Sequence, residues 1–223
     1  MTLDLNDVTA AWEVAAQSKE AQAHIHPSGN HGDEAYRDSG AGQADYVAAI
    51  AAGYLVGNHG PVVDFGCGDG RVLEAMLGWF SGKDLWGADA SATMLERLKG
   101  RIPTVNAILT NGVDGGLDAL EPSLIYSWAV FIHHNHRDGA ALLGALGGSL
   151  RPGGLLALQI PLYRAPTERG GWCDVSVWTE EMLADAARDA GLEIVEMTSS
   201  PGVFDYAAVG VNHGALQILR RPS

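Results

Sequence analysis

Cysteine is almost absent from this sequence. Of the 223 residues only Cys67 and Cys173 are cysteines. Two thiols cannot form a disulfide framework, and they are too few for a thiolate zinc site. The disulfide-rich and zinc-ribbon classes of protein are therefore excluded.

Basic residues are scarce as well. Lys and Arg together number 14 against 27 Asp and Glu, so the formal net charge is −13. A surface this acidic repels the phosphate backbone of DNA or RNA. The composition therefore predicts that nucleic acid is not a partner.

Long apolar runs are also missing. No stretch approaches the roughly 20 apolar residues that a membrane-spanning helix requires. The first residues carry Asp4, Asp7 and Glu13 without the basic cluster of a secretory signal peptide. With so few cysteines, these features predict a soluble protein of the reducing cytoplasm, with no membrane partner.

What the chain does contain is enough apolar sequence for a core. Hydrophobic residues make up 47% and charged residues 18%, which is typical of a folded domain. We expect one domain over residues 1–223, with N-terminal helices and a lid in 1–58 and a core in 59–223. Helices are predicted over 9–23 and 43–55, separated by an irregular segment in which Pro27 and Gly29 favour turns.

Strand and helix patterns alternate from residue 61 onward, which predicts an α/β fold with a doubly wound, mostly parallel sheet and helices on both faces. Ser91 and Thr179 are predicted N-caps of two of these helices. The chain is short for an eight-unit barrel, which takes about 250 residues. The predicted strands span residues 62–65, 85–88, 105–109, 124–128, 155–160, 192–197 and 215–219, and the predicted helices 72–80, 91–99, 137–150 and 180–190.

The turn after the first of these strands is the leading candidate for a binding site. It reads DFGCGDG over residues 64–70, and ligands of open parallel sheets lie beyond the carboxyl ends of the strands. Its glycines expose bare backbone to a ligand, and the next helix offers free amide groups. Asp89 follows the second predicted strand, at the position where a carboxylate accepts hydrogen bonds from ribose hydroxyls.

The best-known glycine motifs do not match this turn. A dinucleotide fingerprint, G-x-G-x-x-G, would need a third glycine where Arg71 stands, and no P-loop string occurs. A glycine-rich turn also occurs in α/β folds that bind nothing there, which leaves a purely structural role as the alternative.

Several segments in order resemble motifs of the class I S-adenosylmethionine-dependent methyltransferases. The match extends over residues 62–194, more than half of the chain. It is carried by DFGCGDG at 64–70, GADASATM at 87–94, SWAVFIHH at 127–134, LRPGGL at 150–155, WTEEM at 178–182 and AGL at 190–192.

The resemblance implies a seven-stranded Rossmann-like sheet with an antiparallel last strand, and S-adenosyl-L-methionine as cofactor. In that family Asp64 would orient the methionine amino group, and Asp89 would hold the ribose. Cys67 fits this turn as a small packing residue rather than as a nucleophile. The further residues implied at the cofactor are Gly66, Cys67, Gly68, Ala90, Met94, Gly112, Val113 and Ser127.

Tyr36 and His133 are the candidate catalytic residues. The segment YRDSG at 36–40 resembles an element that covers the cofactor as a lid in many relatives, and a solvated connector is the alternative. His133 follows the fourth predicted strand, where it would act as general base or orient the acceptor. Packing in the core is the alternative for His133.

Histidines are frequent, with eight in the chain, and six of them gather in two groups. Imidazole binds several transition metals, but no carboxylate at ligand spacing completes a recognisable site. We therefore assign no residue as a metal ligand. Whether the histidine groups bind a metal stays open. His136 is expected to cap the following helix. The two groups are His24, His26 and His31, and His133, His134 and His136.

The absence of base-modifying motifs favours a small-molecule acceptor, with a peptide side chain as the alternative. No D/N-P-P-Y/F string follows the fourth predicted strand, and neither cysteine follows a proline. The alternatives are a protein that binds the cofactor without turnover and an NAD-dependent oxidoreductase on a related fold. The oligomeric state stays open. The aromatic residues that could line an acceptor pocket are Trp12, Trp128, Phe131, Tyr163 and Trp172.

Overall fold

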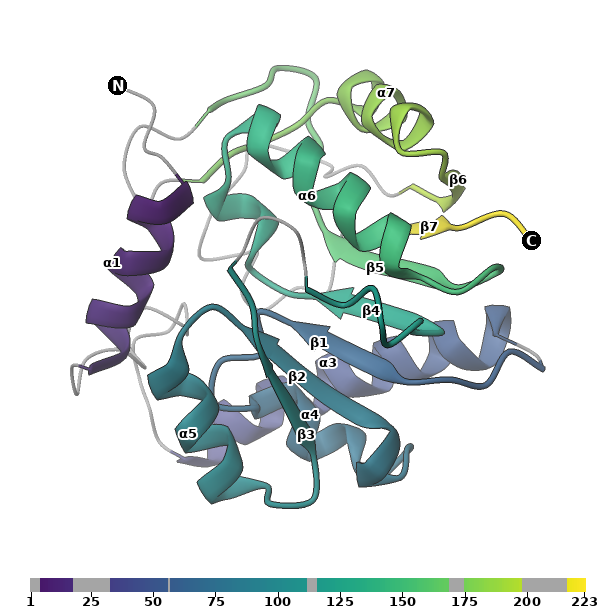
Figure 1. The fold of residues 1–223 in the computed structure, drawn as a ribbon. Coiled ribbons are helices and arrows are strands. Elements are labelled where there is room, and N and C mark those ends of the chain that lie inside the picture. Colours follow the sequence, from purple (N-terminus) through teal and green to yellow (C-terminus); the bar gives the residue numbers. More distant parts are fainter. Residues whose placement is uncertain (1–4, 18–32, 56, 112–115, 169–174, 198–215) are drawn as a thin grey trace.

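A seven-stranded sheet forms the centre of the computed structural model (Figure 1), with the strand order β3-β2-β1-β4-β5-β7-β6. The structure describes residues 5–17, 33–55, 57–111, 116–168, 175–197 and 216–223. The strands are β1 (Val62–Phe65), β2 (Leu85–Asp89), β3 (Asn106–Leu109), β4 (Leu124–Ser127), β5 (Leu155–Gln159), β6 (Glu193–Glu196) and β7 (Leu216–Arg220).

The central strands are parallel and apolar on both sides. Val62 of β1 is in register with Leu85 of β2 and Leu124 of β4, and every residue of β1, β4 and β5 is buried. Continuous apolar runs are typical of parallel strands that helices cover on both faces. Strand β7 pairs antiparallel with both β5 and β6. The predicted fold class, including the antiparallel last strand, is confirmed.

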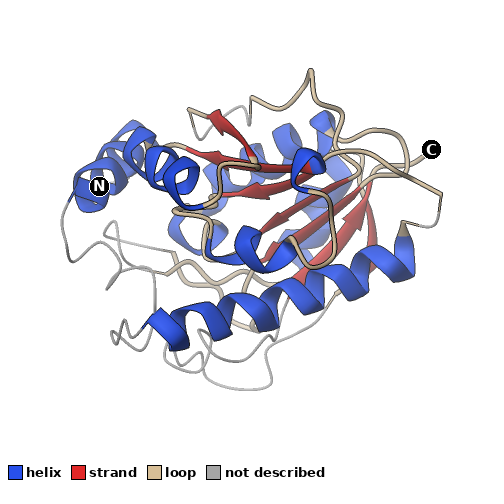
Figure 2. Ribbon diagram, turned by 90° about the horizontal axis from the view of Figure 1, so that it is seen from below, coloured by secondary structure: helices blue, strands red, loops and turns tan. Residues whose placement is uncertain are grey.

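Helices cover the two faces of the sheet in two layers. Helices α3 (Asp33–Tyr54), α4 (Arg71–Met76) and α5 (Ala92–Arg101) pack on one face. Helices α6 (His136–Ser149) and α7 (Glu180–Asp189) pack on the other. Figure 2 shows α3 as the long helix that runs along the molecule beside the strands. The structure also contains two short 3-10 turns, η1 (Gly82–Asp84) and η2 (Phe131–His133).

Side-chain caps fix where the helices begin. The Ser91 hydroxyl accepts from the Met94 amide at 3.1 Å, and the Thr179 hydroxyl accepts from the Met182 amide at 3.2 Å, so both predicted N-caps are confirmed. His136 does not cap α6 as expected. The cap is Asn135, whose side-chain oxygen accepts from the Asp138 amide at 2.8 Å, because a short side-chain carbonyl reaches the first-turn amides.

The N-terminal part departs most from the sequence prediction. Helix α1 (Leu5–Gln17) begins earlier than expected, and the predicted continuation to residue 23 lies outside the described residues. Helix α3 begins at Asp33, so the segment from 33 to 42, predicted as irregular, is helical. Gly40 serves close packing here rather than a turn, because it is buried and a Cβ on it would lie 2.6 Å from the carbonyl oxygen of Arg71.

Helix α4 is shorter than the predicted helix 72–80. It ends at Met76, and the Gly78 amide then bonds to the Ala75 carbonyl at 3.1 Å in a tight turn. Glycine favours this exit because it costs conformational entropy inside a helix.

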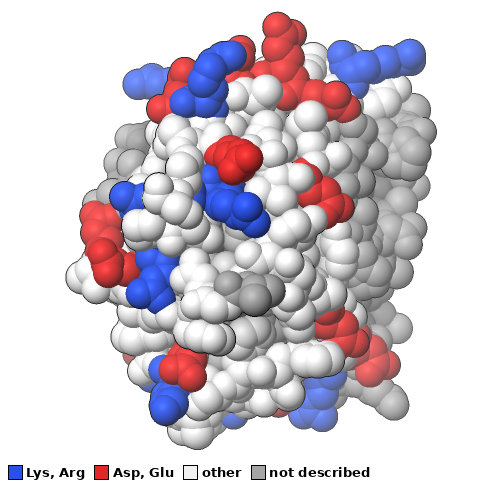
Figure 3. All heavy atoms as spheres, turned by 90° about the vertical axis from the view of Figure 1, so that its right-hand side faces the viewer, with Lys and Arg blue, Asp and Glu red and all other residues white. Residues whose placement is uncertain are grey.

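The described helices and one face of the surface bear on possible partners. No described helix combines the length and apolarity that crossing a bilayer requires. On the face in Figure 3, acidic and basic side chains are interspersed among uncharged residues.

Candidate functional site

The glycine turn after β1 has one open side. Gly66, Gly68 and Gly70 have φ angles of +77°, +55° and +88°, a region that side chains disfavour. A Cβ on Gly66 would lie 2.1 Å from Val130, and one on Gly70 would lie 2.3 Å from Leu98. Among the residues that the structure describes, a Cβ on Gly68 would meet no atom within 4 Å. Bare backbone at Gly68 is therefore available to a ligand.

Asp64 lies buried in β1, just before this turn. Burial raises the pKa of its carboxyl to about 7, and the Arg71 charge and the Tyr126 hydroxyl partly oppose that rise. A cation bound beside a carboxyl group lowers its pKa, so a carboxyl with a pKa near 7 becomes mostly ionised when the cation binds. Ser127, at the end of β4, donates its hydroxyl hydrogen to the Phe65 carbonyl at 2.8 Å. That bond ties the carboxyl ends of β1 and β4 together.

Asp89 connects the glycine turn to the start of α5. One of its carboxylate oxygens accepts from the Gly68 amide at 2.8 Å, and the other accepts from the Ser91 amide at 2.9 Å. The side chain therefore faces the turn, and the residue stays partly exposed. Burial raises the pKa of Asp89, and the two backbone bonds act in the opposite direction.

The segment after β4 carries a strained backbone. Ala129 has a φ of +56°, which costs a non-glycine residue about 1–2 kcal/mol. Its amide donates to the side-chain oxygen of Gln159, in β5, at 2.7 Å. The strained residue precedes Val130 and η2, so the neighbouring strand fixes the path of the chain toward His133.

His133 is buried at 4% exposure. Its ring lies edge-on against the Trp12 ring of α1, with 5.2 Å between the ring centroids and 63° between the planes. The next histidine points elsewhere, since Nδ1 of His134 lies 3.0 Å from the Val130 carbonyl oxygen. The structure thus brings His133 to the carboxyl end of the sheet, beside α1.

Helix α1 is also attached to the start of α5. The carboxylate of Glu13 accepts from the hydroxyls of Ser91 and Thr93, at 2.5 Å each. These bonds hold the pKa of Glu13 at about 2. The same helix buries Ala16 against Met94, so α1 lies across the ends of both β2 and β4.

Comparison with known proteins identifies the family. A family model described as a methyltransferase domain matches residues 41–197, which is more than half of the chain. The chain belongs to this methyltransferase family. The resemblance found in the sequence is therefore confirmed.

Curated relatives include several proteins named trans-aconitate 2-methyltransferase. The one from Methylobacterium radiotolerans is 34% identical over 119 residues, 49% of this chain and 45% of its own length. The one from Azoarcus sp. is 29% identical over 167 residues, 66% of this chain and 64% of its own. The matches cover less than two thirds of these relatives.

Solved structures of other proteins share the fold. Magnesium protoporphyrin IX methyltransferase (ChlM) from Synechocystis PCC 6803, solved with bound SAM, superimposes with a TM-score of 0.67 at 15% identity. That match covers 99% of this chain and 98% of the other. DesVI from Streptomyces venezuelae superimposes with a TM-score of 0.64 at 16% identity, over 82% of this chain and 92% of the other.

Not every methyltransferase residue predicted from the sequence falls within the described part. Gly112 and Val113 lie outside it. Ala90 follows Asp89 and is partly exposed, whereas Met94 is buried under α1. The thiol of Cys67 is buried, which raises its pKa well above the usual value. This protonated thiol agrees with a packing role.

Tyr36 lies in the first turns of α3 rather than in a loop. The predicted lid segment 36–40 was therefore assigned the wrong local structure, although it does approach the glycine turn. Gly40 packs against Arg71, the first residue of α4. Whether the Tyr36 side chain takes part in catalysis stays a prediction.

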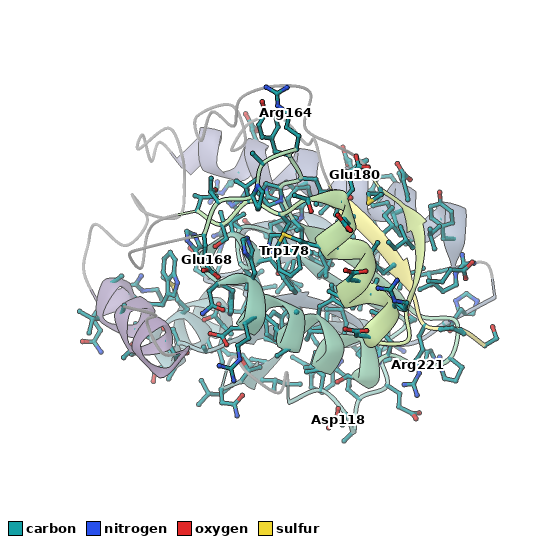
Figure 4. All side chains as sticks on the ribbon, turned by 90° about the horizontal axis from the view of Figure 1, so that it is seen from above. Asp118, Arg164, Glu168, Trp178, Glu180 and Arg221 are labelled. Atoms are coloured by element: carbon teal, nitrogen blue, oxygen red, sulfur yellow. The ribbon has the colours of Figure 1, made fainter. Side chains whose placement is uncertain are left out.

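The histidines form no metal site within the described residues, where no cluster of His, Cys, Asp and Glu side chains could hold an ion. His24, His26 and His31 lie outside that part. Nε2 of His136 lies 3.0 Å from the Val177 carbonyl oxygen, and the His136 amide donates to Glu168 at 3.1 Å. Figure 4 shows Glu168 and Trp178 near the beginning of α6 and Arg164 pointing outward.

The aromatic residues that were candidates for an acceptor pocket differ in burial and in their contacts. Trp12 is partly exposed in α1, beside His133. Trp128 and Phe131 are buried, one on each face of the sheet. Tyr163 is partly exposed, with the Arg164 guanidinium 5.6 Å from its ring centroid. The Trp12 ring contacts His133, whereas the Phe131 ring contacts His134 with 6.2 Å between the centroids. Trp172 lies outside the described residues.

Glu13 is the residue near the site that sequence reasoning missed. The sequence indicates only that this acidic residue argues against a signal peptide. Its partners follow it by 78 and 80 positions, and no local pattern indicates a contact over that separation. The only sequence features that could indicate the contact are an acidic residue on an apolar helix, Glu13, and two hydroxyl residues at the start of another helix, Ser91 and Thr93.

Proposed function

We propose that this chain transfers a methyl group from S-adenosylmethionine to a small-molecule acceptor. The observation that carries the proposal is the open side of Gly68, with the Asp89 carboxylate bonded to its amide. Membership of the methyltransferase family supports the same conclusion.

The residues of the turn fit this cofactor. Gly68 combines a positive φ with a Cβ position that no described residue fills, so a ligand can lie directly against its backbone. Asp89 is partly exposed and keeps lone pairs for a second partner. We assign the ribose hydroxyls to Asp89 and the methionine amino group to Asp64. An amino cation beside Asp64 would favour the charged carboxylate, whose pKa is about 7 without it.

The remaining assignments follow the sequence prediction. Ala90 and Met94 would line the adenine, and Gly66, Cys67 and Ser127 would shape the floor beneath the methionine. Gly112 and Val113 would contact the adenine edge. These positions are proposals for mutagenesis, and the bond from Ser127 to the Phe65 carbonyl supports a shaping role rather than direct binding.

When bound, the sulfonium supplies an activated methyl group that needs no covalent enzyme intermediate. The chain has three tasks: to align the acceptor, to exclude water and to accept a proton. His133 is buried beside Trp12 at the end of β4. We propose that His133 accepts the proton of an acceptor that carries one, or orients the acceptor. Tyr36 remains a second candidate.

The acceptor we propose to test first is a small carboxylic acid, because the curated relatives are named for trans-aconitate. Such an acid is already ionised at neutral pH and loses no proton on methylation, so with this acceptor His133 would orient the substrate. The net charge of −13 argues against nucleic acid as acceptor. The two cysteines and the acidic composition support a cytoplasmic location, which fractionation of the native cells would test.

Calorimetry tests the proposal against its two alternatives. We expect the chain to bind S-adenosylmethionine and S-adenosylhomocysteine and not to bind NADH. Tighter binding of NADH would favour an oxidoreductase. Cofactor binding without turnover, over a panel of acids, amines and alcohols that includes trans-aconitate, would favour a binding protein.

A further inference from the structure

Helix α1 spans two strand ends that form opposite sides of the proposed site. Trp12 meets His133 after β4, and the next residue, Glu13, meets Ser91 and Thr93 after β2. Figure 1 shows α1 beside the start of α5, away from the two helical layers. Since consecutive residues make these two contacts, α1 cannot shift at one strand end without shifting at the other.

The Glu13 carboxylate is the polar anchor of this helix. It accepts from the two hydroxyls at 2.5 Å and from the Thr93 amide at 3.4 Å. Thr93 lies in the first turn of α5, where the helix dipole favours a negative charge. With a pKa of about 2, the carboxylate stays ionised throughout the physiological pH range. The attachment therefore does not depend on protonation there.

The anchor continues to the glycine turn through a chain of hydrogen bonds. Glu13 binds the Ser91 hydroxyl, the Ser91 amide donates to Asp89 at 2.9 Å, and Asp89 accepts from the Gly68 amide at 2.8 Å. The carboxylate on α1 is thus linked to the backbone that would contact the cofactor.

We propose that Glu13 is a positioning residue that fastens α1 across the carboxyl ends of β2 and β4 and so holds Trp12 against His133. In this role Glu13 acts through the placement of α1. The role in turnover rests on the proposed function, whereas the fastening itself does not. Held in this position, α1 would keep water away from the acceptor side of the site.

Hydrogen exchange measures the fastening without any ligand. Glu13→Ala should speed amide exchange over residues 9–17 by about tenfold or more, the change expected when hydrogen bonds to a charged group are lost. Thr93→Val, which keeps the branched shape, should act in the same direction, and the double variant should add little to Glu13→Ala. Val14→Ala is the matched control, because Val14 is 69% exposed on the same helix.

Kinetics then separate positioning from general stability. In Glu13→Ala we expect kcat/KM for the acceptor to fall about tenfold. Asp89 keeps its own bonds to the Gly68 and Ser91 amides, so the dissociation constant for S-adenosylhomocysteine should change less than threefold. The melting temperature should stay close to that of Val14→Ala. Unchanged exchange over residues 9–17 would overturn the fastening. Faster exchange throughout α5 and the sheet, or equal losses of cofactor affinity and acceptor turnover, would overturn the positioning role.

Failure of the proposed function gives a different result. If the wild-type chain bound no S-adenosyl ligand, the exchange experiment would still decide whether Glu13 fastens α1. If the wild type turned over an acceptor and Glu13→Ala matched it in exchange and kcat/KM, only the inference about Glu13 would be wrong.

Discussion

Replacing Asp89 by alanine removes two contributions that can be measured separately. Its carboxylate accepts from the amides of Gly68 and Ser91, and hydrogen bonds to charged groups contribute about 1.5–3 kcal/mol each. Because Asp89 is partly exposed, water replaces much of the lost bonding. We expect Asp89→Ala to lower the free energy of unfolding by about 2 kcal/mol.

The same change should weaken cofactor binding beyond its effect on stability. Loss of the proposed ribose acceptor corresponds to about 1–3 kcal/mol, or roughly a 5- to 150-fold higher dissociation constant for S-adenosylhomocysteine. Urea unfolding followed by circular dichroism gives the first quantity. Calorimetry at a temperature where the variant is fully folded gives the second.

Asp89→Asn is the matched variant, because its amide keeps one carbonyl oxygen of similar shape. It should lose less stability than Asp89→Ala and still bind the cofactor more weakly than wild type. An alanine variant that unfolds more easily but binds S-adenosylhomocysteine like wild type would refute the reasoning. The carboxylate would then serve only the glycine turn, and the ribose would be held elsewhere.

Three further predictions concern the same site. Gly68→Ala should cost about 1 kcal/mol of stability through its positive φ and should weaken cofactor binding. Gly66→Ala should destabilise the fold more, because of the contact with Val130. Urea unfolding measures the stability of both variants, and calorimetry measures their cofactor binding. His133→Ala should lower kcat at least about tenfold, within the range of general acid–base effects, and should change cofactor affinity less than threefold. Turnover equal to that of the wild type would remove His133 from the site. Burial raises the folded pKa of Asp64 from 3.8 to about 7, so the folded state retains the proton and stability should fall as pH rises from about 4 to 7, by up to about 4 kcal/mol. Asp64→Asn should abolish that slope in denaturation curves, and an unchanged slope would assign it to another group.

The sheet and the glycine turn could be predicted because their signals are local. Residues 62–70 form an apolar strand followed directly by glycines with positive φ, and each feature is visible within a few positions. The capping hydroxyls of Ser91 and Thr179 are equally local. For such segments, chain propensity and tertiary packing favour the same conformation.

The N-terminal helices could not be predicted as well, because packing overrode the local pattern. Ser39 and Gly40 favour a loop by composition, yet Gly40 is where α3 approaches the Arg71 carbonyl oxygen. In the same way, Glu13 resembles an ordinary solvated charge until the fold places it at the first turn of α5. Contacts between residues about 80 positions apart leave no trace in a single sequence.

The contact between Gly66 and Val130 limits how this scaffold can be re-engineered. A methyl group of Val130 fills the space that any side chain at residue 66 would need, so the two positions are complementary in size. A bulkier residue at 130, introduced to reshape the acceptor side, would press on the cofactor turn and change both functions together. Mutant libraries for new acceptors should therefore keep valine at 130 and vary residues of α1 instead.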